Sequence, residues 1–249
     1  MSPSSFAKAK GLMAAYNKAL TGRKNQKSQG KAEVIICPPF LYFQMVDERR
    51  SRLMHLGAQN VFWKGQGPYT GQISARMVNE FGAEYVLVGH SESRRLGDTD
   101  VIVATKVREI LKNNMTPIIC VGYKDFVRET KSIVNNFSAE EIGNMFFAYE
   151  PIGSIGTLKP AHPEQVGKAI RSIKNIIFRR FRRKYFFGMV GIGGSKNMVP
   201  QPVVLYGGSI NGENFRDYLE MSELSGFIIG RESFRPESLK KMVQKIEQQ

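Results

Sequence analysis

The sequence is poor in the residues that build disulfide scaffolds, metal clusters and membrane spans. Its 249 residues include two cysteines, Cys37 and Cys120, and three histidines. Two cysteines are too few for a disulfide framework or a multi-cysteine zinc module, and three histidines disfavour a histidine-based metal site. We expect both cysteines to be small buried residues in strand cores. No apolar run reaches 18 residues, and the first residues lack the apolar segment of a signal peptide, so we expect a cytoplasmic protein without a membrane span.

The net charge of +14 is unusually high, and it comes from two segments that contain Lys and Arg but no Asp or Glu. Residues 1–31 hold seven Lys and Arg, and residues 165–212 hold nine, so the rest of the chain carries a net charge of −2. In the stretch 178–187, basic residues alternate with aromatic ones, a composition that can bind nucleic acid through phosphate contacts and stacking. We favour the alternative, a helix end with a solvated basic face and aromatics turned to the core. Residues 21–27 are expected to be an exposed loop.

Short apolar runs separated by helical patterns predict an α/β fold. The runs do not alternate polar with apolar residues, which is typical of parallel strands covered on both faces. Nothing in the chain has the composition of a linker, so we expect one domain, residues 1–249. The expected strands are 34–37, 61–62, 85–88, 117–121, 145–148, 203–206 and 227–229, and the expected helices are 4–20, 99–113, 163–177, 213–220 and 236–247.

Four motifs follow expected strands, at the end where parallel α/β folds place their active sites. They are Gly89-His-Ser-Glu, Tyr149-Glu-Pro-Ile-Gly-Ser-Ile-Gly-Thr, Leu205-Tyr-Gly-Gly-Ser and Ile228-Ile-Gly-Arg. Glu150 is the one carboxylate at the end of its apolar strand, where desolvation would raise its pKa and make it a useful base. Glycines 207 and 208 let backbone N–H groups approach an oxyanion. A second Gly-Gly-Ser, at 193–195, is expected to be a plain loop.

These motifs, in this order, resemble those of the triosephosphate isomerase family, from about Cys37 to Phe234. Gly57-Ala-Gln-Asn and the loop from Trp63 to Gly71 add to the resemblance. It implies a TIM (β/α)8 barrel and a homodimer. It also implies an enzyme of glycolysis and gluconeogenesis that interconverts dihydroxyacetone phosphate and D-glyceraldehyde 3-phosphate through an enediolate, without cofactor or metal. A small sugar phosphate, rather than nucleic acid or a membrane, is then the expected partner.

The resemblance also implies a role for each matching residue. Glu150 would be the catalytic base and His90 the electrophile, with Ser91 and Glu92 in support. The residues expected to bind phosphate are Gly156, Gly207, Gly208, Ser209, Gly230 and Arg231, and those expected in the dimer interface are Tyr69, Thr70 and Gly71.

The chain departs from the family pattern at its start and in its loops. The family begins with a strand ending in Asn-x-Lys, whereas residues 1–10 resemble the sequence just after that Lys. The first strand and the catalytic Lys are thus absent, and we expect the natural start to lie upstream, with Met1 internal. Gly153 replaces a Trp and Arg231 replaces a Gly. Two alternatives stay open: an isomerase of a larger sugar phosphate such as a tetrose phosphate, and a non-catalytic barrel that binds nucleic acid through its basic segments.

Overall fold

The computed structural model describes residues 3–20, 32–122, 124–154, 157, 159–188 and 200–248, with side chains only to residue 182 in the stretch that ends at 188. The expected loops around 21–27 and 193–195 lie outside these residues.

Seven strands form one parallel sheet in which each strand pairs with the next one along the chain. This arrangement confirms the all-parallel sheet predicted from the sequence. All seven carboxyl ends therefore lie at the same edge. The strands are β1 (Val34–Ile36), β2 (Met54–Ala58), β3 (Tyr85–Val88), β4 (Thr116–Val121), β5 (Phe146–Tyr149), β6 (Val203–Tyr206) and β7 (Gly226–Phe227).

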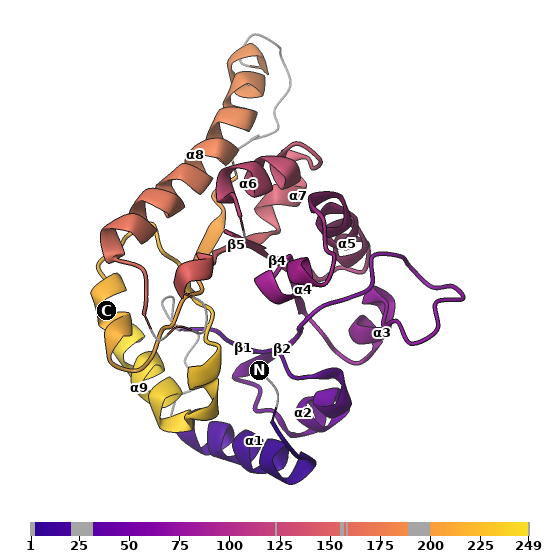
Figure 1. Ribbon diagram of the computed structural model, residues 1–249, viewed down its shortest axis with the longest axis vertical. Helices are drawn as coiled ribbons and strands as arrows, with labels where there is room; N and C mark the ends of the chain where they lie inside the picture. The colour runs from indigo at the N-terminus through magenta and orange to yellow at the C-terminus, as the bar shows by residue number, and fades with distance from the viewer. Residues whose placement is uncertain are drawn as a thin grey trace.

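Helices surround the sheet in a ring (Figure 1). The first and last helices, α1 (Phe6–Leu20) and α9 (Pro236–Ile246), pack against each other. Between them come α2 (Phe43–Arg49), α3 (Ala75–Glu80), α4 (Ser91–Arg95), α5 (Asp100–Lys112), α6 (Phe126–Val134), α7 (Ala139–Gly143) and α8 (Pro163–Gly188). Short 3₁₀ turns are η1 (Phe40–Tyr42), η2 (Ile152–Ser154), η3 (Asn214–Tyr218) and η4 (Arg231–Phe234). None of the helices in the described ranges is long and apolar enough to cross a membrane.

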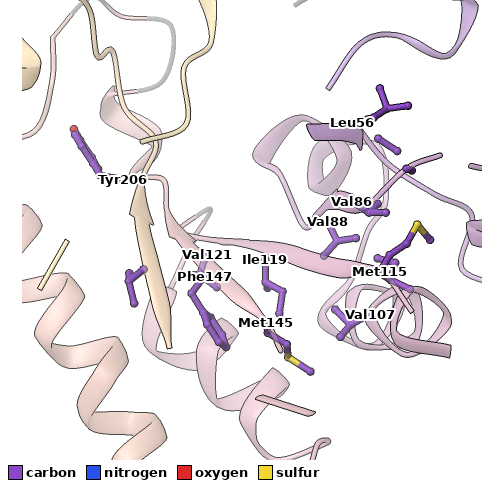
Figure 2. Packing of buried hydrophobic residues seen from close by; sticks show 14 of the residues in the cluster. Leu56, Val86, Val88, Val107, Met115, Ile119, Val121, Met145, Phe147 and Tyr206 are labelled. Carbon is purple, nitrogen blue, oxygen red and sulfur yellow. The ribbon is translucent and has the colours of Figure 1, made fainter. Parts of the chain in front are cut away.

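Both faces of the sheet are covered, as the unbroken apolar runs predict. Val88 of β3 and Ile119 of β4 pack in the large core that includes Val107 of α5 (Figure 2). The alternate residues Ile118 and Cys120 of β4 belong to a second cluster. Partly buried residues from β1, β3, β5, β6 and the segment after β7 pack against this second cluster, so the sheet curls and its inner face meets itself. The arrangement is that of the expected α/β barrel.

Three expectations from the sequence need correction. Val61–Phe62 is not a strand: the second strand is Met54–Ala58, and Val61 is buried in the loop after it. His55 and Gly57 interrupt the apolar run of β2 and hide it, although Met54, Leu56 and Ala58 alternate into the large core between the sheet and the helices. The expected α-helix at 213–220 is instead the short 3₁₀ turn η3, Asn214–Tyr218. Cys37 lies just beyond β1 and is only partly buried, whereas Cys120 is buried inside β4 as expected.

The basic segment continues α8 well beyond the expected end at 177, and this end of the helix extends past the ring (Figure 1). Arg179, Arg180 and Arg182 are exposed and Phe181 is buried, which is the pattern of a solvated basic face. Phe178 is the exception, because its side chain is exposed rather than turned to the core.

Candidate active site

Glu150 stands directly after β5, where neighbouring strands fix its main chain and its side chain. Its N–H donates to the carbonyl of Val121 on β4 at 2.8 Å, and the next strand is tied in by Gly207 N–H donating to Tyr149 at 2.9 Å. A Cβ atom at position 207 would lie 2.7 Å from Glu150 Cγ, so only glycine allows the carboxylate this position. Glu150 is buried, and its Oε2 has no hydrogen-bond partner within the described residues.

His90 follows β3 and faces Glu150. Gly89 turns the chain with a φ of +70°, and His90 then forms the N-cap of α4. The Nδ1 atom accepts the N–H of Glu92 at 3.3 Å, so in the neutral ring the proton resides on Nε2. That Nε2 atom lies 3.6 Å from Glu150 Oε2. The structure thus brings the two expected catalytic side chains together across the site.

Burial shifts the pKa values of the two groups in opposite directions. Burial raises the pKa of Glu150 to about 8, and a hydrogen bond with the Cys120 thiol only partly offsets that rise. Burial lowers the pKa of His90, against an opposing effect of the Glu92 carboxylate. Desolvation disfavours whichever form is charged, which is carboxylate in one case and imidazolium in the other. At neutral pH the pair therefore consists of a neutral imidazole and a carboxyl group that can take up or release a proton.

Ser154 and Ala161, at the two ends of the loop after β5, are hydrogen-bonded to β6 and to residues that follow it. Near its start, the Ser154 carbonyl accepts the hydroxyl of Ser209 at 2.5 Å. At its other end, the N–H of Ala161 donates to the buried Tyr206 hydroxyl at 2.8 Å, and the Tyr218 hydroxyl donates to the Ala161 carbonyl at 2.5 Å. These contacts hold Ser154 and Ala161 beside the carboxyl end of β6.

Only some of the residues expected to bind phosphate lie beside Glu150. Glycines 207 and 208 and Ser209 follow β6 beside Glu150, and Ser209 has a φ of +30°. The Ser209 hydroxyl is engaged with Ser154, so its backbone N–H is the better candidate donor. Gly230 follows β7 in open space, and Arg231 is exposed at the start of η4. Gly156 lies outside the described residues.

Ser91 and Glu92, the residues expected to support catalysis, differ in their burial. Ser91 is buried with its Oγ unpartnered in the described part of the chain, whereas the Glu92 side chain is exposed, with its carboxylate 3.9 Å from His90 Nδ1.

The loop after β2 contains the residues expected in the dimer interface. Tyr69 packs against Phe62, and Thr70 and Gly71 are exposed. Figure 1 shows this loop reaching away from the ring beside α3.

Two buried cations near the site were not predicted from the sequence. Arg94 donates through Nε to the Gly89 carbonyl at 2.8 Å and pairs with Asp100 at the same distance, which braces the turn before His90. Lys106 bonds both oxygens of Asp98 and the side chain of Asn60. In the sequence these residues belong to ordinary charged helix faces, and no local pattern sets them apart.

Comparison with known proteins places this site in a family. The family model described as Triosephosphate isomerase matches residues 4–246. The chain is 36% identical over 234 residues to the Triosephosphate isomerase of Ruthia magnifica subsp. Calyptogena magnifica, covering 89% of both chains. It is 31% identical over 249 residues to that of Coprinopsis cinerea, covering 95% of this chain and 91% of the relative. The chain belongs to the triosephosphate isomerase family.

Membership of the triosephosphate isomerase family confirms two expectations from the sequence. The seven parallel strands with their helix ring are the α/β TIM barrel that the resemblance implied. The enzyme class is likewise an isomerase, since the relative from Caldanaerobacter subterraneus subsp. tengcongensis, 33% identical over 86% of both chains, also has the name Triosephosphate isomerase. Neither alternative kept open above is favoured by these comparisons.

Proposed function

We propose that the protein interconverts dihydroxyacetone phosphate and D-glyceraldehyde 3-phosphate by proton transfer. One observation carries the proposal: a buried carboxylate, Glu150, faces the Nε2 of a neutral His90 at 3.6 Å, at the carboxyl end of a parallel barrel. Moving a proton between adjacent carbons of a hydroxy carbonyl compound requires a base beside a C–H bond and a donor beside the carbonyl oxygen. Glu150 and His90 have these two chemistries.

In the proposed reaction, the Glu150 carboxylate removes a proton from the carbon next to the substrate carbonyl. The electron pair of that C–H bond forms the C=C bond of an enediolate, and the carbonyl π electrons move to oxygen. His90 donates its Nε2–H to that oxygen as negative charge develops. The protonated Glu150 then returns its proton to the neighbouring carbon, and the electron pair of the C=C bond forms this new C–H bond. The hydroxyl group on the first carbon gives its proton to Nε2 of His90 and becomes the new carbonyl, so both side chains return to their starting states. The geometry at position 207, which leaves no room for a side chain, keeps the carboxyl group at one position through both transfers.

Backbone N–H groups are proposed to bind the substrate phosphate. The loop after β5 is proposed to exclude water from the site. The N–H groups of Gly207, Gly208 and Ser209 follow β6, and Gly230 follows β7; with Gly156 they form the proposed phosphate set. Glycine brings such groups close to an oxyanion. The hydrogen bonds at Ser154 and Ala161 tie both ends of this loop to β6 and the residues after it. Closure of the loop over bound substrate would protect the enediolate from water.

We further propose a cytoplasmic homodimer, in keeping with a glycolytic reaction. The loop that contains Tyr69, Thr70 and Gly71 is the proposed interface element. It is stiffened by aromatic packing of Tyr69 on Phe62 and by the Lys64 ammonium over the Tyr69 ring. Sedimentation of the wild type and of Tyr69→Ala tests this: a dimer that Tyr69→Ala weakens is expected, and a monomeric wild type would contradict the proposal.

A coupled isomerase assay with both triose phosphates tests the reaction directly. We expect turnover in both directions, with incorporation of solvent deuterium at the carbon that is reprotonated, and loss of both in Glu150→Gln. Retention of turnover in Glu150→Gln would refute the assignment of the base. The same assay with tetrose phosphates tests the larger-substrate alternative, for which the exposed Arg231 and the open space at Gly230 are the specific observations. A higher kcat/KM on a tetrose phosphate would favour that alternative.

A further inference from the structure

Glu129 is a buried acidic residue on α6 that the proposed reaction does not use. It is only 1% exposed, and its carboxylate turns back toward the loop that joins β4 to α6. Oε2 accepts the N–H of Gly122 at 2.7 Å, and Oε1 accepts the N–H groups of Lys124 and Asp125 at 3.1 and 3.4 Å. One carboxylate thereby fixes three backbone donors of a loop at the carboxyl end of the barrel.

The peptide unit between Val121 and Gly122 joins this carboxylate to Glu150. Its N–H is the group that donates to Glu129 Oε2, and its carbonyl accepts the N–H of Glu150 at 2.8 Å. The bond is trans, so the N–H and the carbonyl point in opposite directions. Glu129 and the Glu150 main chain therefore lie at opposite edges of a single peptide unit. A charged acceptor on the N–H also polarises the peptide and strengthens its carbonyl as an acceptor.

Close packing leaves this peptide little freedom to move independently of Glu150. Gly122 has a φ of +121°, in the left-handed region, and a Cβ atom there would lie 2.7 Å from the carbonyl oxygen of Glu150. Rotation of the peptide would therefore displace the Glu150 main chain. On its other side, Glu150 is confined by Gly207, whose missing Cβ leaves the room that the side chain occupies.

We propose that Glu129 is a positioning residue for Glu150, acting through the peptide between Val121 and Gly122. It does not touch the substrate in this scheme; it fixes the main chain from which the catalytic carboxylate extends. The inference rests on the proposed function, because positioning matters through the base role of Glu150. It adds to that function a residue on the outer layer of the barrel whose loss should change the chemistry more than the binding.

Three substitutions at position 129 and one control separate positioning from plain stability. Glu129→Gln keeps an oxygen that can accept the Gly122 N–H, Glu129→Asp withdraws the carboxylate by one methylene, and Glu129→Ala removes it. Ile133→Val is the matched control, because Ile133 is buried on the same helix. The readouts are kcat and KM on the triose phosphates, melting temperature, and the titration of Glu150 followed by carbon-13 NMR of the carboxyl group.

The expected pattern is a kcat lowered about tenfold or more in Glu129→Asp and Glu129→Ala, with KM changed less than about twofold, because small displacements of a catalytic group are costly to rate. Glu129→Gln should recover most of that loss. The Glu150 pKa should fall from about 8 toward its ordinary value in Asp and Ala, since a loosened loop admits water. Ile133→Val should lower the melting temperature and leave kcat and the Glu150 titration unchanged.

Two results would overturn the inference. One is a folded Glu129→Asp or Glu129→Ala variant with wild-type kcat and wild-type Glu150 titration. The other is an Ile133→Val variant that reproduces the loss of kcat at an equal loss of stability. If Glu129→Ala does not fold, the comparison of Asp with Gln decides the matter. If the wild type lacks turnover, the proposed function fails, and the Glu150 titration in the variants still decides whether Glu129 positions that residue.

Discussion

The Nε2 atom of His90 lies 3.6 Å from the Oε2 atom of Glu150, and the burial that surrounds both atoms shifts their pKa values in opposite directions. The same loss of water makes Glu150 a weaker acid, and its carboxylate a stronger base, and makes His90 a weaker base that favours its neutral form. The backbone N–H of Glu92 donates to Nδ1 and thereby fixes the tautomer of the neutral ring, with the proton on Nε2, the nitrogen that faces Glu150. A base and a hydrogen-bond donor are thereby set face to face.

The pH dependence of kcat/KM should follow the ionisation of Glu150. The base must be a carboxylate to remove a proton, and its pKa in the free enzyme is about 8, so kcat/KM should rise as pH increases from 6 to 9. Burial lowers the pKa of His90, so its protonation moves to lower pH, away from the ionisation of Glu150. Initial rates across this pH range check the prediction. A profile that is flat or falling between pH 6 and 9 would contradict it.

Glu150→Gln should abolish turnover and change how stability depends on pH. The pKa of this carboxyl is near 4.5 when unfolded and about 8 when folded, so between those values the folded state holds the extra proton. In the wild type the free energy of unfolding then falls with rising pH, by up to about 1.4 kcal/mol per pH unit from this group, and the stabilising contribution is lost as pH passes 8. Glutamine cannot ionise. Urea unfolding should show that the free energy of unfolding of Glu150→Gln, relative to that of the wild type, is higher at pH 8 than at pH 5. The same difference in free energy of unfolding at both pH values would exclude the linkage.

The alternation of the sheet explains which strands the sequence reveals. In β4, Ile118 and Cys120 face the inner cluster while Ile119 and Val121 face the helices, so positions 117–121 are all apolar and the run is conspicuous. In β2, His55 interrupts the run, and its ring finds a partner in Glu84 at 2.6 Å outside the core. Residues 54–58 still form a strand, because β2 pairs with β1 and β3 and because Met54, Leu56 and Ala58 are buried in the large core. The local sequence does not reveal this pairing.

Some residues of the candidate site could be predicted from the sequence and others could not. Glu150 and His90 follow strands in short motifs, so their positions at one edge of the sheet could be inferred before the fold was described. Glu129 and Arg94 could not, because a charged residue on a helix has the same local pattern whether it faces solvent or a loop of the site. Their roles depend on which backbone groups the fold leaves within reach: the Gly122 N–H for Glu129 and the Gly89 carbonyl for Arg94.

Gly207→Ala should damage the chemistry more than the fold. The added methyl would lie 2.7 Å from Glu150 Cγ and 2.8 Å from Oε1, so the carboxylate must shift to make room. We expect kcat to fall by about tenfold to a hundredfold, because a displacement near 1 Å costs a rate of that order. The control is Gly11→Ala on the exposed face of α1, where a methyl meets nothing within 4 Å and should add about 0.5–1 kcal/mol of stability. Wild-type kcat in Gly207→Ala would contradict the close packing of Glu150.

Tyr206→Phe should loosen the far end of the loop after β5. The buried Tyr206 hydroxyl accepts the N–H of Ala161 at 2.8 Å, and its removal leaves that N–H without this acceptor, at a cost of about 1–3 kcal/mol to the closed arrangement. If closure excludes water during the reaction, kcat/KM should fall about tenfold or more, and proteolysis within 152–161 should speed up. Tyr42→Phe is the control, because the Tyr42 hydroxyl bonds the Pro3 carbonyl, away from this loop. Equal rates for both variants would show that the hydrogen bond at Ala161 stabilises the fold without contributing to catalysis.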